Sequence, residues 1–155
     1  MHILMVCTGN TCRSPLAEAM LRARLADRPR LADISVSSAG TSAWAGTPAS
    51  EGSYLVALER GLDLSAHRAV ALTPELVERS DLILTMGRNH LEAVKAMGGA
   101  GLVHTLVDFA GRLPGLPDEV ADPVGGDVEA YREMAGALDH LLALAVTRLE
   151  REAPR

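Results

Sequence analysis

A thiol, a cation and a hydroxyl lie close together near the start of the sequence. Cys7 is followed by five residues and then by Arg13 and Ser14. A guanidinium can hold two oxygens of one phosphate, and a positive environment favours the thiolate form of a cysteine. We therefore expect Cys7 to attack the phosphorus of a phosphoryl group that Arg13 holds. The Ser14 hydroxyl can either cap the following helix or donate to the Cys7 sulfur and help that sulfur leave.

The loop between Cys7 and Ser14 also offers backbone donors. A loop that leads from a strand into a helix N-terminus can turn successive N–H groups inward, and the helix dipole adds positive potential there. Gly9 and Asn10 are residue types that tolerate the left-handed backbone that such a curl needs. The predicted phosphate-binding residues are Thr8, Gly9, Asn10, Thr11, Cys12, Arg13 and Ser14.

Alternating strand and helix patterns surround this loop. Apolar runs predict strands at residues 3–6, 34–37, 82–84 and 102–107, and helical spacing predicts helices at 16–28, 89–97 and 127–151. Ser38-Ala39-Gly40-Thr41 is expected to form a turn, and residues 111–126 a long loop. The alternation favours one α/β domain over residues 1–155, with three layers, a mostly parallel sheet and helices on both faces.

Three hydroxyl–proline pairs are expected to start helices. They are Ser14-Pro15, Thr47-Pro48 and Thr73-Pro74. In each pair the hydroxyl can cap free amides, while proline suits the first helical position because it lacks the donor that would be unpaired there.

Composition excludes several functions. The chain has 155 residues and a net charge of −5, and its cationic residues are scattered rather than gathered into a basic stripe, so we expect no nucleic-acid partner. The start at Met1 shows no leader pattern and no apolar run reaches membrane-spanning length, which predicts a cytoplasmic protein without a membrane partner. Two cysteines make no disulfide framework, and the histidines lack zinc-ligand spacing. We expect neither a metal nor another cofactor.

Several motifs together resemble the low-molecular-weight protein phosphatases. Besides residues 7–15 they are Ser38-Ala39-Gly40-Thr41, Asp63-Leu64-Ser65-Ala66-His67, residues 81–86 and Asp122-Pro123. The resemblance covers the whole chain and implies a four-stranded parallel sheet, a Cys7 nucleophile, an Arg13 phosphate clamp and Asp122 as the general acid. An acid opposite the nucleophile is chemically reasonable, because the leaving group needs a proton and the phosphocysteine then needs an activated water.

The resemblance also implies supporting roles for two residues. His67 belongs to a hydrogen-bond network with Asn10, Ser14 and Ser38 that fixes the loop. Cys12 can form a reversible disulfide with Cys7 that shields the nucleophile from further oxidation. Asp118 and Asp127 are the reserves for the acid, although Asp127 is expected to cap the last helix and Asp118 to be solvated.

The substrate is expected to be a phosphorylated protein, with inorganic phosphate as product. The strings around Cys7 and Asp122 look most like the bacterial protein-arginine phosphatase branch, in which a Thr at the position of Thr11 favours a guanidinium over an aromatic ring. Val124 weakens this match, and Trp44 is the one ring expected near the mouth. We predict a phosphoarginine phosphatase, with phosphotyrosine as the alternative.

Three other functional classes fit the sequence less well. An arsenate reductase of this fold would need further cysteines downstream of Cys12, and the sequence has none. A non-catalytic phosphate-binding or redox-sensing module would have no need of Asp122. A dinucleotide site would need more glycines than Gly9 in the first loop. We expect a monomer, although no sequence feature determines the oligomeric state.

Overall fold

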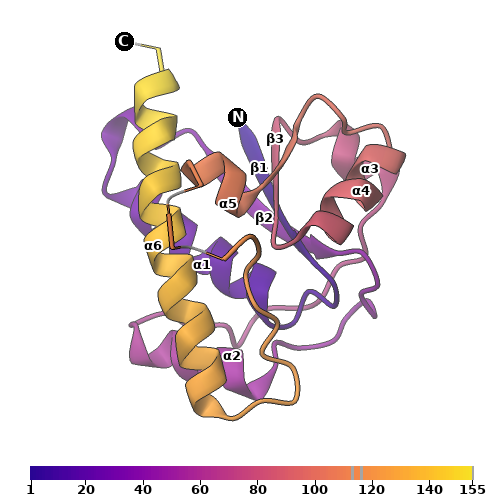
Figure 1. The fold of residues 1–155 in the computed structure, drawn as a ribbon, viewed down its shortest axis with the longest axis vertical. Coiled ribbons are helices and arrows are strands. Elements are labelled where there is room, and N and C mark those ends of the chain that lie inside the picture. Colours follow the sequence, from indigo (N-terminus) through magenta and orange to yellow (C-terminus); the bar gives the residue numbers. More distant parts are fainter. Residues whose placement is uncertain (113, 116, 155) are drawn as a thin grey trace.

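A computed structural model describes residues 1–112, 114–115 and 117–154 (Figure 1). The four strands are β1 (His2–Cys7), β2 (Ser35–Gly40), β3 (Leu82–Thr85) and β4 (Val103–Thr105). The helices are α1 (Arg13–Ala26), α2 (Glu51–Glu59), α3 (Pro74–Glu78), α4 (Arg88–Ala96), α5 (Leu106–Ala110) and α6 (Val128–Glu152), with a 3-10 turn η1 at Pro29–Leu31. The predicted α/β architecture is confirmed.

The strands form one parallel sheet in the order β2-β1-β3-β4. β1 lies inside the sheet, so its side chains must be covered on both faces. Ile3 and Met5 belong to one apolar cluster, while Leu4 and Val6 belong to another. This alternation follows from the period of two along a strand. The loop that follows β1 therefore leaves from the middle of the carboxyl edge of the sheet.

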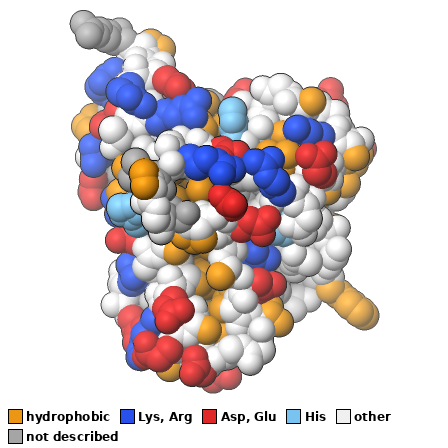
Figure 2. Space-filling view, viewed as in Figure 1, with side chains coloured by type: hydrophobic (Ala, Val, Ile, Leu, Met, Phe, Trp, Pro, Cys, Tyr) orange, Lys and Arg blue, Asp and Glu red, His pale blue; other side chains and the backbone are white. Residues whose placement is uncertain are grey.

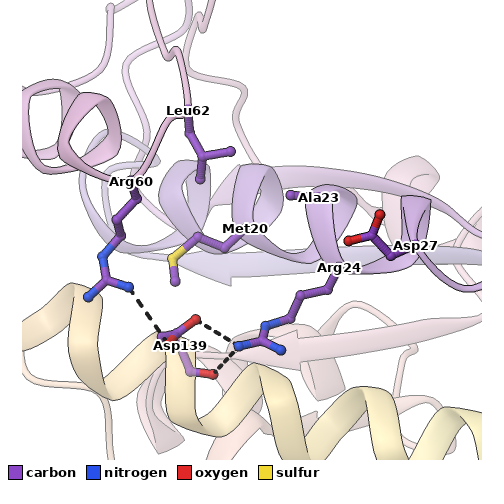
Figure 3. A pocket seen from close by; sticks show the side chains of 7 residues that line it. All are labelled: Met20, Ala23, Arg24, Asp27, Arg60, Leu62 and Asp139. Carbon is purple, nitrogen blue, oxygen red and sulfur yellow. Dashed lines mark hydrogen bonds and ion pairs between the residues drawn. The ribbon is translucent and has the colours of Figure 1, made fainter.

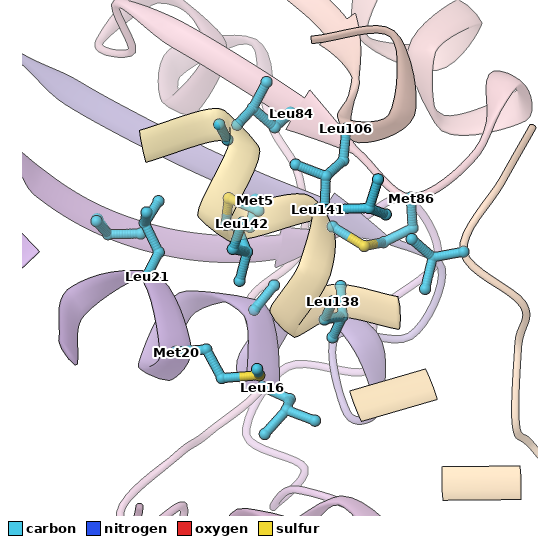
Figure 4. Close-up of a cluster of buried hydrophobic side chains, with 14 of the residues drawn as sticks. Met5, Leu16, Met20, Leu21, Leu84, Met86, Leu106, Leu138, Leu141 and Leu142 are labelled. Atoms are coloured by element: carbon cyan, nitrogen blue, oxygen red, sulfur yellow. The ribbon is translucent and has the colours of Figure 1, made fainter. Parts of the chain in front are cut away.

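The larger cluster lies between the sheet and helices α1, α2, α5 and α6. Figure 4 shows how side chains from α1 and α6 meet those of the strands, with Leu21, Leu142 and Met5 gathered between them. Helices α3 and α4 cover the opposite face with Val77, Leu91 and Val94. Burial of these side chains holds α1, and with it the end of the Cys7 loop, firmly against the sheet.

Of the helix starts predicted at Thr73-Pro74 and Thr47-Pro48, only the first is present. Thr73 caps α3 as predicted, because its side chain accepts from the Leu76 N–H at 3.2 Å. Thr47-Pro48, however, starts no helix: the Thr47 carbonyl accepts from the Ala69 N–H, and Pro48 pairs with Arg68 in an isolated bridge. This pairing keeps the segment extended.

Helix α2 instead begins after Ser50, whose side chain accepts from the Ser53 N–H. Two other boundaries were also misplaced. The segment expected to turn at Ser38 continues as β2 to Gly40, because β2 pairs with β1 as far as Cys7. The strand expected to reach Val107 ends at Thr105, whose hydroxyl caps α5. The long helix prediction was accurate, since Asp127 caps α6.

The seam between α1 and α6 carries a surface hollow of about 410 Å³ (Figure 3). Asp139 of α6 accepts from Arg24 of α1 at 2.8 Å and lies 3.8 Å from Arg60, just after α2. Met20 and Leu62 supply apolar lining. The hollow shares no lining residue with the Cys7 loop, and the ion pairs of Asp139 with Arg24 and Arg60 link α6 to α1 and to the end of α2.

Figure 2 shows acidic and basic side chains interspersed on this face, with acidic groups gathered at the lower end over α2 and the start of α6. This face therefore presents no broad positive surface of the kind that a nucleic-acid backbone needs. None of the helices within the described residues is long and apolar enough to cross a membrane.

Candidate active site

The Cys7 loop connects the end of β1 to the start of α1. Asn10 adopts the left-handed conformation, with φ of 55°. Gly9 does not, so its lack of a side chain is not required by a positive φ. The prediction that this segment curls with a left-handed residue is therefore correct at Asn10 and wrong at Gly9.

Most carbonyl groups of the loop are bonded to the surrounding protein. The carbonyls of Cys7, Thr8, Asn10, Thr11 and Cys12 accept hydrogen bonds from Thr41, Ser42, His67, Ser50 and Ser53, respectively, at 2.7 to 2.9 Å. The N–H groups of residues 8–13, in contrast, donate to no acceptor in the described part of the chain. The peptide dipoles are thus fixed with their positive ends free, which is the arrangement of an anion-binding nest.

The end of β2 closes against this loop. A Cβ atom on Gly40 would lie 2.5 Å from the Thr8 carbonyl oxygen and 2.9 Å from the Asn10 nitrogen. Both obstacles are backbone atoms, which cannot move without distorting the loop. Glycine at position 40 therefore allows a close approach that no other residue type would permit.

Ser14 bonds to the Cys7 sulfur rather than capping the helix. Its Oγ lies 2.9 Å from the Cys7 sulfur, and both side chains are buried. Helix α1 already begins at Arg13, with Cys12 at the N-cap and no side-chain cap. The Ser14-Pro15 capping prediction is wrong because the hydroxyl faces the sulfur, which was the other possibility considered for it.

The predicted supporting network is present. The Asn10 amide donates to Ser14 at 2.8 Å and to Ser38 at 2.9 Å, and the Asn10 carbonyl oxygen lies 2.7 Å from His67 Nε2. Ser38 in turn donates to Glu18 of α1. Asn10 and Ser14 are fully buried, so these bonds determine both the loop conformation and the orientation of the Ser14 hydroxyl.

Arg13 is held beside the loop with one donor unused. Its side chain is 6% exposed; one terminal nitrogen donates to the Val120 carbonyl at 3.1 Å, and the other lies 3.5 Å from Asp122 and 3.4 Å from Thr8 Oγ1. Its Nε is buried and has no partner among the described residues. Leaving such a donor unpaired costs free energy unless an anion accepts from it.

Asp122 contacts Arg13 from the segment that precedes α6. One carboxylate oxygen contacts Arg13, and the other accepts from the Val124 N–H at 3.0 Å. The side chain is 46% exposed, so solvent and a bound molecule can reach it. The two reserve acids are engaged elsewhere: Asp118 pairs with Arg112, and Asp127 caps α6.

The structure brings one further residue to the site for which the sequence predicted no role. His90 of α4 is 1% exposed, and its Nε2 lies 2.8 Å from Thr8 Oγ1. Burial, followed by the nearby Arg13 charge, lowers the pKa of His90 from 6.5 to about 4. The only available signal was its place on the apolar face of the predicted helix at 89–97.

Of two further residues considered for the site, Cys12 is buried and Trp44 is exposed. Cys12 is a buried free thiol, and its sulfur donates to Ser50 Oγ at 3.2 Å and lies 3.7 Å from the Tyr131 hydroxyl. The reversible pairing of Cys12 with Cys7 stays a prediction. Trp44 is 85% exposed in the segment after β2, so its ring is available for contact with another molecule.

Comparisons with known proteins agree with this geometry. The family model for low molecular weight phosphotyrosine protein phosphatase matches residues 2–155. The protein-arginine-phosphatase of Bacillus subtilis (strain 168) is 34% identical over 154 residues, covering 98% of this chain and 99% of the relative.

Two solved structures share the fold. The crystal structure of a low molecular weight protein tyrosine phosphatase from T. tengcongensis has a TM-score of 0.86 at 36% identity and covers 96% of this chain and 99% of that one. A YwlE arginine phosphatase in which serine replaces a cysteine, with a phosphorylated active-site serine, has a TM-score of 0.86 at 32% identity. The match covers 98% of this chain and 97% of that one. With a family match over nearly the whole length, the chain belongs to the low molecular weight phosphotyrosine protein phosphatase family.

Proposed function

We propose that this chain hydrolyses phosphoarginine on proteins, with Cys7 as nucleophile, Arg13 as phosphate clamp and Asp122 as general acid. The observation that carries the proposal is the loop itself. Its carbonyls are bonded outward, while the N–H groups of residues 8–13 and Arg13 Nε have no acceptor in the described chain. The loop that carries these donors runs from Cys7 to Arg13, so a phosphoryl group bound to them lies within reach of the Cys7 sulfur.

In the first step the Cys7 thiolate forms a bond to phosphorus. The bond between phosphorus and the leaving nitrogen breaks, its electron pair stays on nitrogen, and the Asp122 carboxyl supplies the proton. The substrate arginine leaves, and a phosphocysteine remains. The relative with a phosphorylated active-site serine supports such a covalent intermediate.

In the second step water attacks the phosphocysteine. The Asp122 carboxylate takes a proton from the water, the sulfur–phosphorus bond breaks, and its electron pair returns to Cys7. The Ser14 hydroxyl, 2.9 Å from the sulfur, stabilises the thiolate as it leaves. Inorganic phosphate is released, and the enzyme returns to its starting state.

Phosphotyrosine is the second candidate substrate. Thr11 in the loop and the B. subtilis relative support phosphoarginine. The T. tengcongensis relative and the exposed side chains of Trp44 and Val124, which could contact an aromatic ring, support phosphotyrosine. We give phosphoarginine precedence because Thr11 offers a polar neighbour to a guanidinium, which an aliphatic side chain would not.

The deciding experiment measures kcat/KM on matched phosphoarginine and phosphotyrosine peptides. We expect the wild type to prefer phosphoarginine, and Thr11→Ile to shift the ratio of the two constants toward phosphotyrosine by at least about tenfold. A wild type that prefers phosphotyrosine, or a ratio that Thr11→Ile leaves unchanged, would transfer the proposal to phosphotyrosine.

The Cys7→Ser variant tests the reaction class independently of the substrate. It should lose turnover but retain binding of inorganic phosphate, because the N–H groups and Arg13 remain. Turnover near the wild-type rate would contradict the nucleophile assignment. Turnover of p-nitrophenyl phosphate by the wild type separates an enzyme from a module that only binds phosphate.

The proposal extends to the context of the reaction. The substrates are phosphorylated proteins, in keeping with the relatives' names. We further propose that residues 1–155 form one catalytic domain, which acts as a cytoplasmic monomer. The single sheet and the family match over residues 2–155 support the domain assignment.

A further inference from the structure

Thr8 directly follows the nucleophile, and its hydroxyl contacts two donor-bearing side chains. His90 Nε2 lies 2.8 Å from Thr8 Oγ1, and an Arg13 terminal nitrogen lies 3.4 Å from the same oxygen. Arg13 can only donate, so it occupies one acceptor position of the hydroxyl. The direction of the shorter contact then decides what the Thr8 hydrogen can do.

The surroundings of His90 indicate that its Nε2 is the donor. The other ring nitrogen, Nδ1, is buried and has no partner in the described chain. A neutral imidazole carries its proton on one nitrogen, and burying an unpaired N–H group is costlier than burying an unpaired lone pair. The ring is neutral at pH 7, because its pKa is lowered to about 4 by burial and by Arg13. The proton therefore lies on Nε2 and points to Thr8.

This arrangement fills both acceptor positions of Thr8 Oγ1 and leaves its hydrogen without an acceptor among the described residues. The oxygen lies beside the guanidinium that is proposed to hold the phosphate. We propose that the Thr8 hydroxyl donates a hydrogen bond to a phosphoryl oxygen of the substrate, and that buried His90 is the positioning residue that orients it. The inference rests on the proposed phosphatase function and adds a donor to its site.

The first turn of helix α4 is bonded to the segment that carries Val120 and Asp122. The Glu119 carboxylate accepts from the Arg88 N–H at 3.1 Å, in the first turn of α4 and two residues before His90. Glu119 immediately precedes Val120, whose carbonyl binds Arg13 and whose N–H donates to the Met86 carbonyl. The segment that carries Asp122 and the helix that carries His90 are therefore fixed to each other.

The test is a double-mutant cycle with conservative controls. Thr8→Val removes the hydroxyl at constant shape, and Thr8→Ser keeps it. His90→Met removes the ring donor, and His90→Gln keeps an amide donor at a similar reach. The readouts are kcat/KM for p-nitrophenyl phosphate and the Kd of inorganic phosphate by titration calorimetry, with thermal unfolding as the check on folding.

We expect Thr8→Val to lower kcat/KM about tenfold and to weaken phosphate binding by a similar factor, which is the usual effect of one lost hydrogen bond to a charged group. Thr8→Ser should stay within about threefold of the wild type. His90→Met should reproduce the Thr8→Val loss, and His90→Gln should restore most of it. In the double variant the two losses should not multiply, because His90 acts through Thr8.

Several results would overturn the inference. One is a Thr8→Val variant with wild-type kcat/KM and phosphate affinity, which would mean that the hydroxyl donates to His90 instead. Another is a double variant whose losses multiply, which would separate His90 from Thr8. If His90→Met fails to fold, the Thr8 pair and His90→Gln still decide the question. A wild type inactive on p-nitrophenyl phosphate would count against the proposed function alone, since phosphate binding by Thr8→Val needs no turnover.

Discussion

At the residue scale, the site places the Cys7 sulfur, in contact with the Ser14 hydroxyl, at the start of a loop whose N–H groups are held in fixed positions. The side chains of Cys7 and Ser14 are buried and in contact, and the Asn10 side-chain amide orients Ser14 by donating a hydrogen bond to its hydroxyl oxygen. The side-chain amide of Asn10 and its backbone carbonyl are hydrogen-bonded to the surrounding protein, so the loop is preorganised before a substrate arrives. Such preorganisation stabilises developing charge without reorganisation during the reaction.

Arg13→Lys should reduce kcat/KM by well over about tenfold, which corresponds to more than about 1.4 kcal/mol. A lysine is a point charge and cannot reproduce both the bond to the Val120 carbonyl and the fork toward a phosphate. The measurement is kcat/KM on p-nitrophenyl phosphate. A smaller loss would show that the planar fork of Arg13 is not needed.

Asp122→Asn should slow esters with poor leaving groups far more than esters with good ones. The amide cannot supply the proton that a poor leaving group requires, whereas p-nitrophenolate leaves readily without it. Rates across a series of aryl phosphates of increasing phenol pKa measure this slope. A uniform loss across the series would transfer the acid role to another group, with Asp118 tested first.

At the element scale, the site depends on four segments that converge at the carboxyl edge of the sheet. β1 and α1 supply the loop, the end of β2 supports its back, α4 supplies His90, and the segment before α6 supplies Asp122. Parallel strands bring these connections to the same edge, which is where such sheets bind ligands.

Gly40→Ala should disrupt the loop, because the new methyl would meet the backbone of Thr8 and Asn10 at 2.5 and 2.9 Å. We expect a lower Tm and a loss of kcat/KM of at least about tenfold. Gly136→Ala is the matched control: Gly136 lies inside α6, and its Cβ would meet no atom within 4 Å. That substitution should stabilise the protein by about 0.5 to 1 kcal/mol. Wild-type activity in Gly40→Ala would show that the close approach is unimportant.

At the scale of the whole molecule, the two apolar layers hold α1 and α4 on opposite faces of the same sheet. The loop lies between the ends of these helices, so groups from both faces meet there. The contact between His90 and Thr8 is one such meeting, and it joins residues 82 positions apart in the sequence.

The burial of His90 should make global stability depend on pH. The pKa of His90 is about 4 in the folded protein and 6.5 when exposed; burial and then the Arg13 charge lower this pKa, while Glu119 and Asp122 raise it. Between these values the unfolded chain binds a proton that the folded protein does not, so the free energy of unfolding should fall as the pH drops from 6.5 to 4. We expect a contribution of about 1 to 3 kcal/mol from this group.

Urea unfolding of the wild type and His90→Gln across this pH range measures the effect. The pKa of His104 is also lowered, chiefly by burial, but His104 is present in both proteins and its contribution cancels in the difference. The wild type should lose more stability than His90→Gln on acidification. Parallel curves would mean that His90 titrates normally in the folded protein.

The sequence, with the family resemblance it carries, predicted the Cys7 loop, the order of the four strands, the capping of α3 and α6 and the network around Asn10, but it did not predict α5. The loop, the strands and the caps follow from residue spacing and from chemistry within short segments, and the network follows from the motifs shared with the family. The tertiary structure decided which partner Ser14 takes, why Thr47-Pro48 stays extended against Arg68, where β2 and β4 end, and that His90 reaches Thr8. Each of these depends on a hydrogen bond or steric contact between residues far apart in the chain, and such contacts outweigh local propensities of about 1 kcal/mol or less.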